Sequence, residues 1–299
     1  MATLKDIAQR AGVTATTVSR VINNRGYISE GTRKKVYAAM EEMHYQPNEL
    51  ARAFSKQYTN TIGLIVPHIS HPFFIKVISN LESSAAEKGF KLLLCNSKEQ
   101  PEKEQDYLDM CISNRVAGIV LCSKYVQTRE FRKMNIPVVN LERGGDDDTI
   151  SVQCDNYQGG KLAAEHLIEC GCKNLLHFGG VAGKDMPADR RADGFSDVCK
   201  KAGIPYRILV SDRLQYGSMH YEDFIRRALQ EFPDVDGIFA SSDLIASQVI
   251  QVGAQMDKHV PEDIQLVGFD DVMISTVTTP QITTIHQPVE EMAELCVEY

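Results

Sequence analysis

The side chains that most often perform catalysis or bind metals are spread through this 299-residue chain without a recognisable grouping. The eight cysteines include no Cys-x-x-Cys pair and no paired cysteine–histidine cluster. We interpret them as reduced, mostly buried apolar residues, with metal ligation as the alternative. No nucleophile–base pair and no pair of acids emerges from the spacing. We therefore expect no catalytic residue, no metal site, no cofactor and no enzymatic activity.

Two short segments carry weaker signals. The Gly179–Gly183 segment follows an apolar run but fits neither G-x-G-x-x-G nor Walker A spacing, so a tight turn is favoured over a phosphate loop. The three consecutive acids Asp146–Asp148 could bind a cation, but a solvated loop is the simpler interpretation.

Charge is distributed unevenly along the chain. The net charge is -8, yet residues 1–60 hold nine Lys/Arg against five Asp/Glu, so that segment is basic and the remainder strongly acidic. A basic N-terminal segment on an acidic body indicates an N-terminus that faces phosphates.

The composition excludes several classes of protein. With 43% hydrophobic and 24% charged residues, the chain is a soluble globular protein rather than a disordered or collagenous one, and its length suggests two or three domains. No apolar run approaches the roughly 20 residues that span a bilayer, and the N-terminus has no apolar secretory segment. We expect a cytoplasmic protein without a membrane partner.

Residues 1–46 have the pattern of a small helical domain. Thr3 can cap a helix with Leu4, Ile7 and Ala11 at helical spacing, and Gly12 can end it. A second helix follows over 15–23 and a third from residue 29. Helix, short glycine-containing turn and helix predict a helix-turn-helix, with a small, polar outer face on the second helix that suits a major groove. An ordinary three-helix bundle without DNA is the alternative.

The segment 47–60 separates this domain from the rest. Pro47 starts a stretch too short for an independently stable helix, which makes it a candidate hinge.

From residue 61 the pattern changes to alternating strands and helices. Short apolar runs at 62–67, 91–95, 117–122 and 137–141 alternate with helical segments, and a second series follows at 174–180, 207–210, 237–241 and 264–270. Continuous apolar strands between helices are typical of parallel sheets covered on both faces. Two series predict two Rossmann-like lobes with a ligand cleft at the carboxyl ends of the strands.

Several segments in order resemble the LacI/GalR family of transcriptional regulators: TLKDIAQRAGVTATTVSRVIN, YQPNELARAF, NTIGLIVPHISHPFF, RADGF, VGFDD and TTIHQP. The resemblance covers essentially the whole chain, and NNRGYISEGTRKKVYAAMEEMHYQPN is most similar to the branch of sucrose-operon repressors. It implies an all-α helix-turn-helix headpiece on an α/β core like that of periplasmic binding proteins.

The resemblance also implies domain limits. These are a headpiece over 1–46, a hinge over 47–60, an N-terminal lobe from 61–157 with 286–299, and a C-terminal lobe over 158–285. The family normally continues beyond Tyr299, so we expect the last piece of the second lobe to be missing. A helix that reads half of a palindromic operator further implies a homodimer.

Family members read their operator with the second helix. By position, Ala15, Thr16 and Arg20 should approach base edges, with Arg20 the best donor to guanine. Ala15 is too small to bond a base, so it touches a thymine methyl or leaves room. The resemblance implies phosphate contacts for five further residues, namely Thr3, Thr14, Thr17, Ser19 and Asn23.

The family's hinge wedges an apolar side chain into the minor groove. This chain has Phe54 where the family usually has leucine, with Arg52 beside it for a minor-groove or phosphate contact. An incidental exposed phenylalanine is the alternative.

The positions that match the family's effector residues suit a sugar, which needs aromatic faces and groups that bond hydroxyls. The aromatic residues are Phe73, Phe74 and Tyr216, and the polar ones are Asp155, Arg191, Ser242 and Asp270. Arg191 and Asp270 should clamp vicinal hydroxyls from opposite sides.

Each effector position has a simpler interpretation. The Phe pair could be lobe core, Arg191 a structural ion pair and Asp270 a helix cap. Ser242 stands where many members have asparagine, so its contact is the weakest. The set suits a neutral sugar better than a purine and leaves sugar phosphates open.

The resemblance therefore predicts a repressor of carbohydrate-utilisation genes, controlled allosterically by a sugar or sugar phosphate bound between the lobes. Two alternatives are a sugar-binding receptor without DNA-linked function and a Rossmann-type enzyme. The missing export signal and basic N-terminus disfavour the first, and the missing dinucleotide fingerprint disfavours the second.

Overall fold

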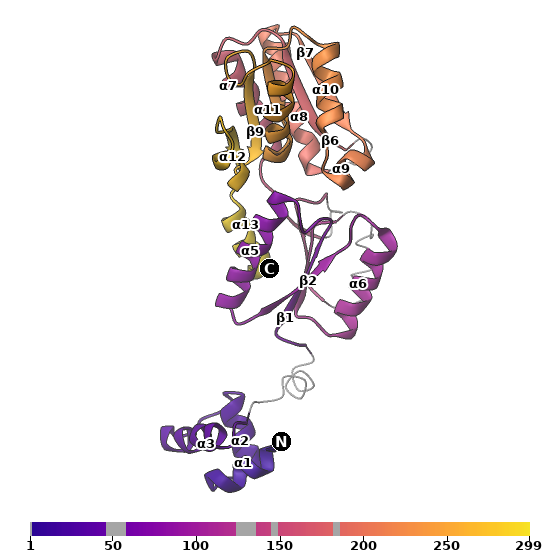
Figure 1. Ribbon diagram of the computed structural model, residues 1–299. Coiled ribbons are helices and arrows are strands. Elements are labelled where there is room, and N and C mark those ends of the chain that lie inside the picture. Colours follow the sequence, from indigo (N-terminus) through magenta and orange to yellow (C-terminus); the bar gives the residue numbers. More distant parts are fainter. Residues whose placement is uncertain (1, 46–57, 124–135, 145–148, 182–185) are drawn as a thin grey trace. The chain divides into compact units, whose positions relative to one another are not determined.

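The computed structural model describes residues 2–45, 58–123, 136–144, 149–181 and 186–299. The chain divides into two compact units, Met1–Thr59 and Asn60–Tyr299 (Figure 1). Most of the predicted hinge, with Arg52 and Phe54, lies outside the described residues.

The N-terminal unit contains three helices, α1 (Leu4–Ala11), α2 (Ala15–Ile22) and α3 (Glu30–Glu42). Thr3 caps α1, Gly12 ends it at a φ of 66°, and Thr14 caps α2 by accepting a hydrogen bond from the Thr17 backbone N–H. The apolar faces of the helices form one core from Ile7, Ala8, Val18, Val21, Val36 and Ala39. The predicted helix-turn-helix is therefore confirmed.

The second unit contains two parallel five-stranded sheets. The first has the order β2-β1-β3-β4-β5 and the second the order β10-β9-β8-β6-β7. The first sheet comprises β1 (Thr61–Val66), β2 (Lys91–Asn96), β3 (Gly118–Leu121), β4 (Val138–Leu141) and β5 (Ile150–Val152). The second comprises β6 (Leu175–Val181), β7 (Tyr206–Ser211), β8 (Gly237–Ala240), β9 (Gln265–Asp270) and β10 (Thr283–His286). This confirms the predicted α/β core with two parallel sheets.

The helices of this unit cover the sheets (Figure 1). On the first sheet lie α5 (Pro72–Glu87), α6 (Pro101–Ser113) and α13 (Val289–Glu298), and α13 packs against α5 in one apolar core. The second lobe contains α7 (Asn156–Glu169), α8 (Arg190–Ala202), α9 (Arg213–Ser218), α10 (Glu222–Glu231), α11 (Asp243–Gln255) and α12 (Met273–Val277). The chain therefore passes from the first lobe to the second after β5 and returns after β10.

Four elements were not predicted: the strands β5 and β10 and the short helices α9 and α12. Both strands lie at sheet edges and are short, and β10 (TTIH) has no buried residue, so neither has the apolar run by which the other strands were found. The helix α9 has six residues and none of them is buried. Hydrophobic periodicity cannot detect such elements because burial does not select their residues.

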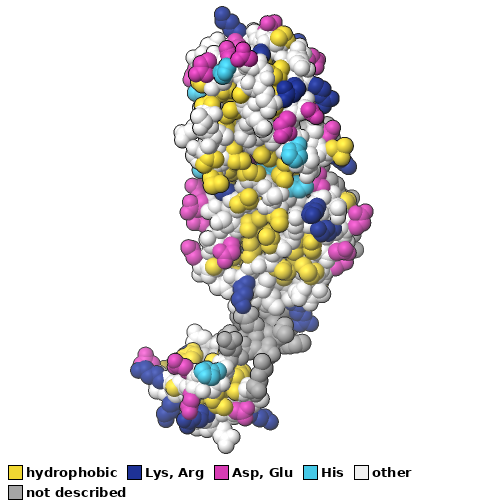
Figure 2. All heavy atoms as spheres, in the orientation of Figure 1, with side chains coloured by type: hydrophobic (Ala, Val, Ile, Leu, Met, Phe, Trp, Pro, Cys, Tyr) yellow, Lys and Arg dark blue, Asp and Glu magenta, His cyan; other side chains and the backbone are white. Residues whose placement is uncertain are grey.

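The two other edge strands, β2 and β7, carry exposed apolar side chains. Leu94 on β2 is 42% exposed, and Ile208 and Val210 on β7 are 37% and 49% exposed. Hydrophobic side chains also gather on the face of the core unit in view in Figure 2. Exposed apolar edges are unusual on a monomer and typical of an interface.

Helices α7 and α8 pack closely because glycines face each other across them. A Cβ atom on Gly160 would lie 2.0 Å from the Arg191 carbonyl oxygen, and one on Gly194 would lie 2.0 Å from the Tyr157 carbonyl oxygen. Each glycine therefore contacts the backbone in the first turn of the opposite helix. That backbone can make room for a side chain only if the whole helix shifts.

We predict that Gly160→Ala destabilises the protein by about 3 kcal/mol, because the added methyl forces α7 and α8 apart. Urea unfolding of the core transition measures this. Gly217→Ala is the matched control: it also lies in a helix, and an added methyl there meets no atom within 4 Å. A Gly160→Ala variant as stable as the Gly217→Ala variant would contradict the prediction.

Candidate functional site

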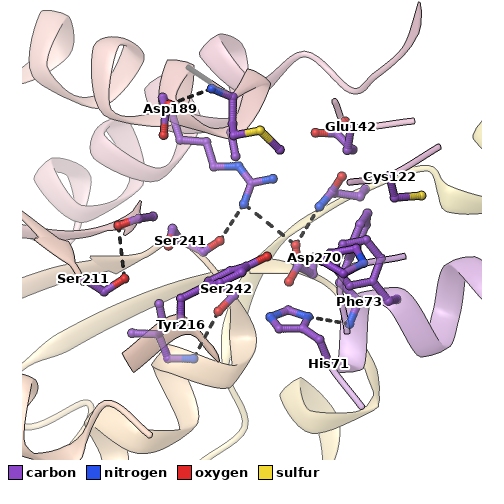
Figure 3. A pocket seen from close by; sticks show the side chains of 18 of the residues that line it. His71, Phe73, Cys122, Glu142, Asp189, Ser211, Tyr216, Ser241, Ser242 and Asp270 are labelled. Carbon is purple, nitrogen blue, oxygen red and sulfur yellow. Dashed lines mark hydrogen bonds and ion pairs between the residues drawn. The ribbon is translucent and has the colours of Figure 1, made fainter. Parts of the chain in front are cut away.

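A cavity of about 140 Å³ lies where the carboxyl ends of the two sheets face each other. Its residues follow strands of both lobes: Ser123 comes after β3, Ser241 after β8, and Asp270 ends β9. In open α/β sheets this edge is where ligands bind. Figure 3 shows the labelled side chains converging from both lobes.

Six of the seven predicted effector residues line this cavity, namely Phe73, Phe74, Arg191, Tyr216, Ser242 and Asp270. The seventh, Asp155, caps α7 by accepting a hydrogen bond from the Gln158 backbone N–H at 2.9 Å. Asp155 lines a separate depression, together with Tyr157 and Arg190.

Several of the simpler interpretations hold alongside the functional ones. Phe73 and Phe74 are both 7% exposed and belong to the apolar core of the first lobe while their rings also reach the cavity. Ser242 caps α11 through its hydroxyl oxygen, which accepts from the Ile245 backbone N–H. A capped or packed residue can thus present its remaining surface to a ligand.

Arg191 is held by four partners. Its Nε donates to the Asn156 Oδ1 at 2.7 Å, and its NH1 donates to the Ser241 carbonyl oxygen at 2.6 Å. The same nitrogen lies 3.9 Å from the Asp270 Oδ1, and the guanidinium carbon is 3.5 Å from the centre of the Phe269 ring. Arg191 and Asp270 are therefore neighbours, and the guanidinium orientation is fixed before any ligand arrives.

Asp270 is buried beside Arg191 and accepts a hydrogen bond from Gln287 Nε2 at 2.6 Å. Its backbone has a φ of 107°, a value that residues other than glycine rarely adopt. Burial raises the pKa of Asp270 to about 8, against the opposing effect of the Arg191 charge. Strained, buried ionisable groups of this kind cluster at functional sites.

Sequence reasoning missed several polar residues of the cavity: His71, Ser123, Glu142, Ser241 and Gln287. Each follows the carboxyl end of a strand within a few residues, and that position is the signal that could have identified them.

Two of these residues have buried polar atoms without a hydrogen-bond partner in the part of the chain that the structure describes. They are the Ser123 Oγ and the Gln287 Oε1. Since buried polar atoms are normally bonded, both are candidates for ligand contacts.

His71 and Glu142 lie on the first lobe and are also fixed in place. His71 accepts the Phe73 backbone N–H at its Nδ1, and burial lowers the pKa of this imidazole to about 4. Glu142 accepts the Cys154 backbone N–H at 2.6 Å and the Asn156 Nδ2 at 3.0 Å. Because Asn156 also bonds Arg191, Glu142 and Arg191 are joined through one amide that connects the two lobes.

In the N-terminal unit, the predicted base-reading residues lie on α2. Arg20 and Thr16 are exposed, and Ala15 is half-buried. All five predicted phosphate contacts take part in local hydrogen bonds. Thr3 and Thr14 cap α1 and α2, and Asn23 Nδ2 donates to the Ser19 carbonyl oxygen at 2.8 Å. Thr17 bonds the Thr14 hydroxyl. The contacts of Thr3, Thr14 and Thr17 order the N-termini of α1 and α2, the helix ends that favour phosphate, whereas the Asn23 bond lies at the C-terminal end of α2.

Within the described residues, no helix is long and apolar enough to span a membrane, and no three His, Cys, Asp or Glu side chains are grouped as metal ligands.

Comparison with known proteins finds matches for both units of the chain. Residues 3–48 match the bacterial regulatory proteins of the lacI family, and residues 59–294 match the periplasmic binding proteins and sugar binding domain of the LacI family. The ribose operon repressor of Halalkalibacterium halodurans is 35% identical over 98% of this chain and 87% of its own length. The sucrose operon repressor of Pediococcus pentosaceus is 36% identical over 98% of this chain and 90% of its own length.

Solved structures share the fold of this chain. The lac repressor dimer bound to operator and the anti-inducer ONPF superposes with a TM-score of 0.83 at 23% identity, over 99% of this chain and 91% of that one. A LacI transcriptional regulator from Alkaliphilus metalliredigens complexed with D-xylulofuranose has a TM-score of 0.71 and 32% identity, over 80% of this chain and 89% of that one.

We predict that Asp270→Asn flattens the pH dependence of stability. The folded pKa of about 8 exceeds the unfolded value near 3.9, so between these values the folded state retains a proton that the unfolded state releases. Stability therefore falls as pH rises through this window in the parent protein. The variant should gain at least about 1 kcal/mol relative to the parent between pH 5 and pH 7.5.

Urea unfolding at the two pH values measures this difference. Asp193→Asn, on the exposed surface of α8, controls for the loss of one carboxylate. Parallel pH profiles for the parent and Asp270→Asn would show that Asp270 does not carry the proton.

Proposed function

Because the chain belongs to the LacI family of bacterial regulatory proteins, we propose that it is a repressor of carbohydrate-utilisation genes whose operator affinity is controlled by a sugar bound in the cavity. One observation carries the proposal. The same chain has a helix-turn-helix with an exposed Arg20 and a cavity with buried Ser123 and Gln287 oxygens that have no hydrogen-bond partner among the described residues.

The domain limits follow the same division. We propose residues 1–46 as the DNA-binding headpiece, 47–60 as the hinge, 61–157 with 286–299 as one lobe and 158–285 as the other. The return of the chain after β10 and the packing of α13 against α5 support the split first lobe.

A repressor of this kind must act as a dimer, because one recognition helix reads a half-site of only a few base pairs. We propose that the exposed apolar edges at β2 and β7, with Leu94, Ile208 and Val210, contribute to the contact between two copies. Both lobes would then belong to the interface, so a change in the angle between the lobes would reach both headpieces.

The physical route of control is closure of the cavity. Direct contacts already join the lobes beside it: Lys76 Nζ donates to the Asp271 carbonyl oxygen at 2.7 Å, and the rings of His68 and Tyr216 lie 5.6 Å apart. A ligand that bonds residues of both lobes favours one inter-lobe angle over another. The ligand can change the operator affinity only to the extent that it binds the two inter-lobe arrangements with different affinities.

A second candidate is a sugar-binding receptor without DNA-linked function. The cavity alone would suit it, but the basic N-terminal unit and the small, polar face of α2 favour the regulator.

We predict that Arg20→Ala lowers discrimination at one base pair of each half-site by roughly 1–3 kcal/mol, because a guanidinium that bonds guanine is lost. The operator is first selected from random duplexes, and fluorescence anisotropy then compares operator with scrambled DNA. Lys34→Ala, an exposed cation on α3, is the control for charge alone and should leave the discrimination unchanged. If Arg20→Ala keeps the parent's preference at every base pair, Arg20 is not the base reader.

We predict that a sugar that raises the melting temperature of the parent binds at least about tenfold more weakly to Arg191→Lys. A lysine keeps the charge but loses the planar fork held by Asn156 and Ser241. A thermal-shift screen of sugars, beginning with sucrose, ribose and fructose, supplies the ligand, since binding to the native state alone raises its stability.

Arg190→Lys is the matched control, because Arg190 precedes Arg191 on the same helix and pairs with the exposed Asp193. Equal loss of affinity in both variants would place the ligand elsewhere. The same sugar should change operator affinity in the anisotropy assay, and no effect there would contradict the proposed control.

A further inference from the structure

Residues 154–156 form the first crossover between the lobes, which leads from β5 into the first turn of α7. The Asn156 backbone N–H donates to the Cys154 carbonyl oxygen at 2.9 Å, and Asp155 has a φ of -76° and a ψ of 79°, so this segment is an inverse γ-turn. Glu142 holds the turn from the first lobe. Its two carboxylate oxygens accept the Cys154 backbone N–H and the Asn156 Nδ2. The path of the first crossover therefore depends on one carboxylate.

The side-chain amide of Asn156 bonds groups of opposite charge. Its Nδ2 donates to the Glu142 Oε2 at 3.0 Å and to the Cys154 carbonyl oxygen at 3.3 Å, while its Oδ1 accepts from the Arg191 Nε at 2.7 Å. Only this orientation fits, because the reverse would set the amide oxygen against a carboxylate and the amide nitrogen against a guanidinium. An amide suits this place because one planar group offers an acceptor to a cation and donors to an anion.

The return crossover, between β10 and α13, has a similar construction. It contains an inverse γ-turn at Pro288 (φ -78°, ψ 62°), where the Val289 backbone N–H donates to the Gln287 carbonyl oxygen at 2.8 Å. The Gln287 amide donates from Nε2 to the Asp270 Oδ1 at 2.6 Å. Each crossover thus places one amide against one member of the Arg191–Asp270 pair.

We propose that Asn156 is a positioning residue that couples the first crossover to the Arg191 guanidinium and so sets the angle between the lobes. Asn156 is not among the described lining residues of the cavity, yet it joins two residues that are, Glu142 and Arg191. All three are at most 9% exposed, so water does not readily replace their bonds. A shift of either partner therefore reaches the crossover. The proposal rests on the proposed function only for the step from inter-lobe angle to operator affinity.

An exchange of amide and carboxylate between positions 142 and 156 tests the coupling by urea unfolding. In Asn156→Asp, a carboxylate keeps the bond from Arg191 but faces Glu142 without a donor. In Glu142→Gln, the new amide N–H group meets a donor, at Cys154 or at Asn156. With both changes, the glutamine donates to the aspartate and the net charge of the parent is kept.

We expect each single variant to lower the equilibrium constant for folding at least about tenfold. The double variant should be at least about tenfold more stable than the two single effects combined predict, which is about 1.4 kcal/mol of coupling. A purely local role of Asn156 at the start of α7 would give no such rescue.

Asn174→Asp is the matched control, since Asn174 is an exposed asparagine of the second lobe that precedes β6, at the sheet edge opposite the cavity. Its effect should add to that of Glu142→Gln, because the two side chains share no contact. Additive effects of Asn156→Asp and Glu142→Gln, or a double variant that fails to fold, overturn the coupling.

Fluorescence anisotropy with the selected operator then measures the effect on DNA binding, since none of these positions lies in the N-terminal unit. We expect Asn156→Asp to change the operator affinity at least about fivefold and the double variant to return it to within about twofold of the parent. Asn174→Asp should leave the affinity unchanged.

An Asn156→Asp variant with the operator affinity of the parent overturns the positioning role, even if the stability of the double variant is restored. An altered affinity that the double variant does not restore also overturns it, because Asn156 would then not act through Glu142. A parent chain without preference for any operator would instead contradict the proposed function, and the unfolding measurements would still decide the coupling.

Discussion

The buried guanidinium of Arg191 is the constraint on which the arrangement of the cavity depends. A charge this far from water is tolerated only when its hydrogen-bond donors are satisfied. Asn156 and Ser241 accept hydrogen bonds from the guanidinium, and Asp270 Oδ1 lies 3.9 Å from it. These residues come from the start of α7, the residue after β8 and the end of β9. Because Asn156 also donates to Glu142 of the first lobe, the same requirement links the two lobes at the cavity wall.

The close packing of α7 and α8 makes this network possible. Asn156 is the first residue of α7, and Arg191 lies in the first turn of α8. Their side chains meet at 2.7 Å only because Gly160 and Gly194 allow the two backbones to approach. The polar geometry of the cavity thus depends on two positions that carry no side chain and are not among the lining residues.

Division of charge separates the two tasks of the chain. The basic N-terminal unit presents Arg20 and the capped starts of α1 and α2, which suit a phosphate backbone and base edges. The rest of the chain carries the net negative charge. DNA phosphates are therefore attracted to the N-terminal unit and repelled by the net charge of the core.

The sequence by itself determined the elements whose residues are chosen by burial or by capping. Thr3, Gly12 and Thr14 fixed the helix-turn-helix, and continuous apolar runs identified eight of the ten strands of the core. Resemblance to a known family also placed six of seven proposed effector residues, because motifs such as RADGF and VGFDD keep their order along the chain. Only the tertiary structure decided that Asp155 caps a helix outside the cavity while Glu142 and Gln287 line it. Those positions depend on where the chain crosses between lobes after β5 and β10, and local periodicity contains no information about contacts between residues more than a hundred positions apart, such as Glu142 and Gln287.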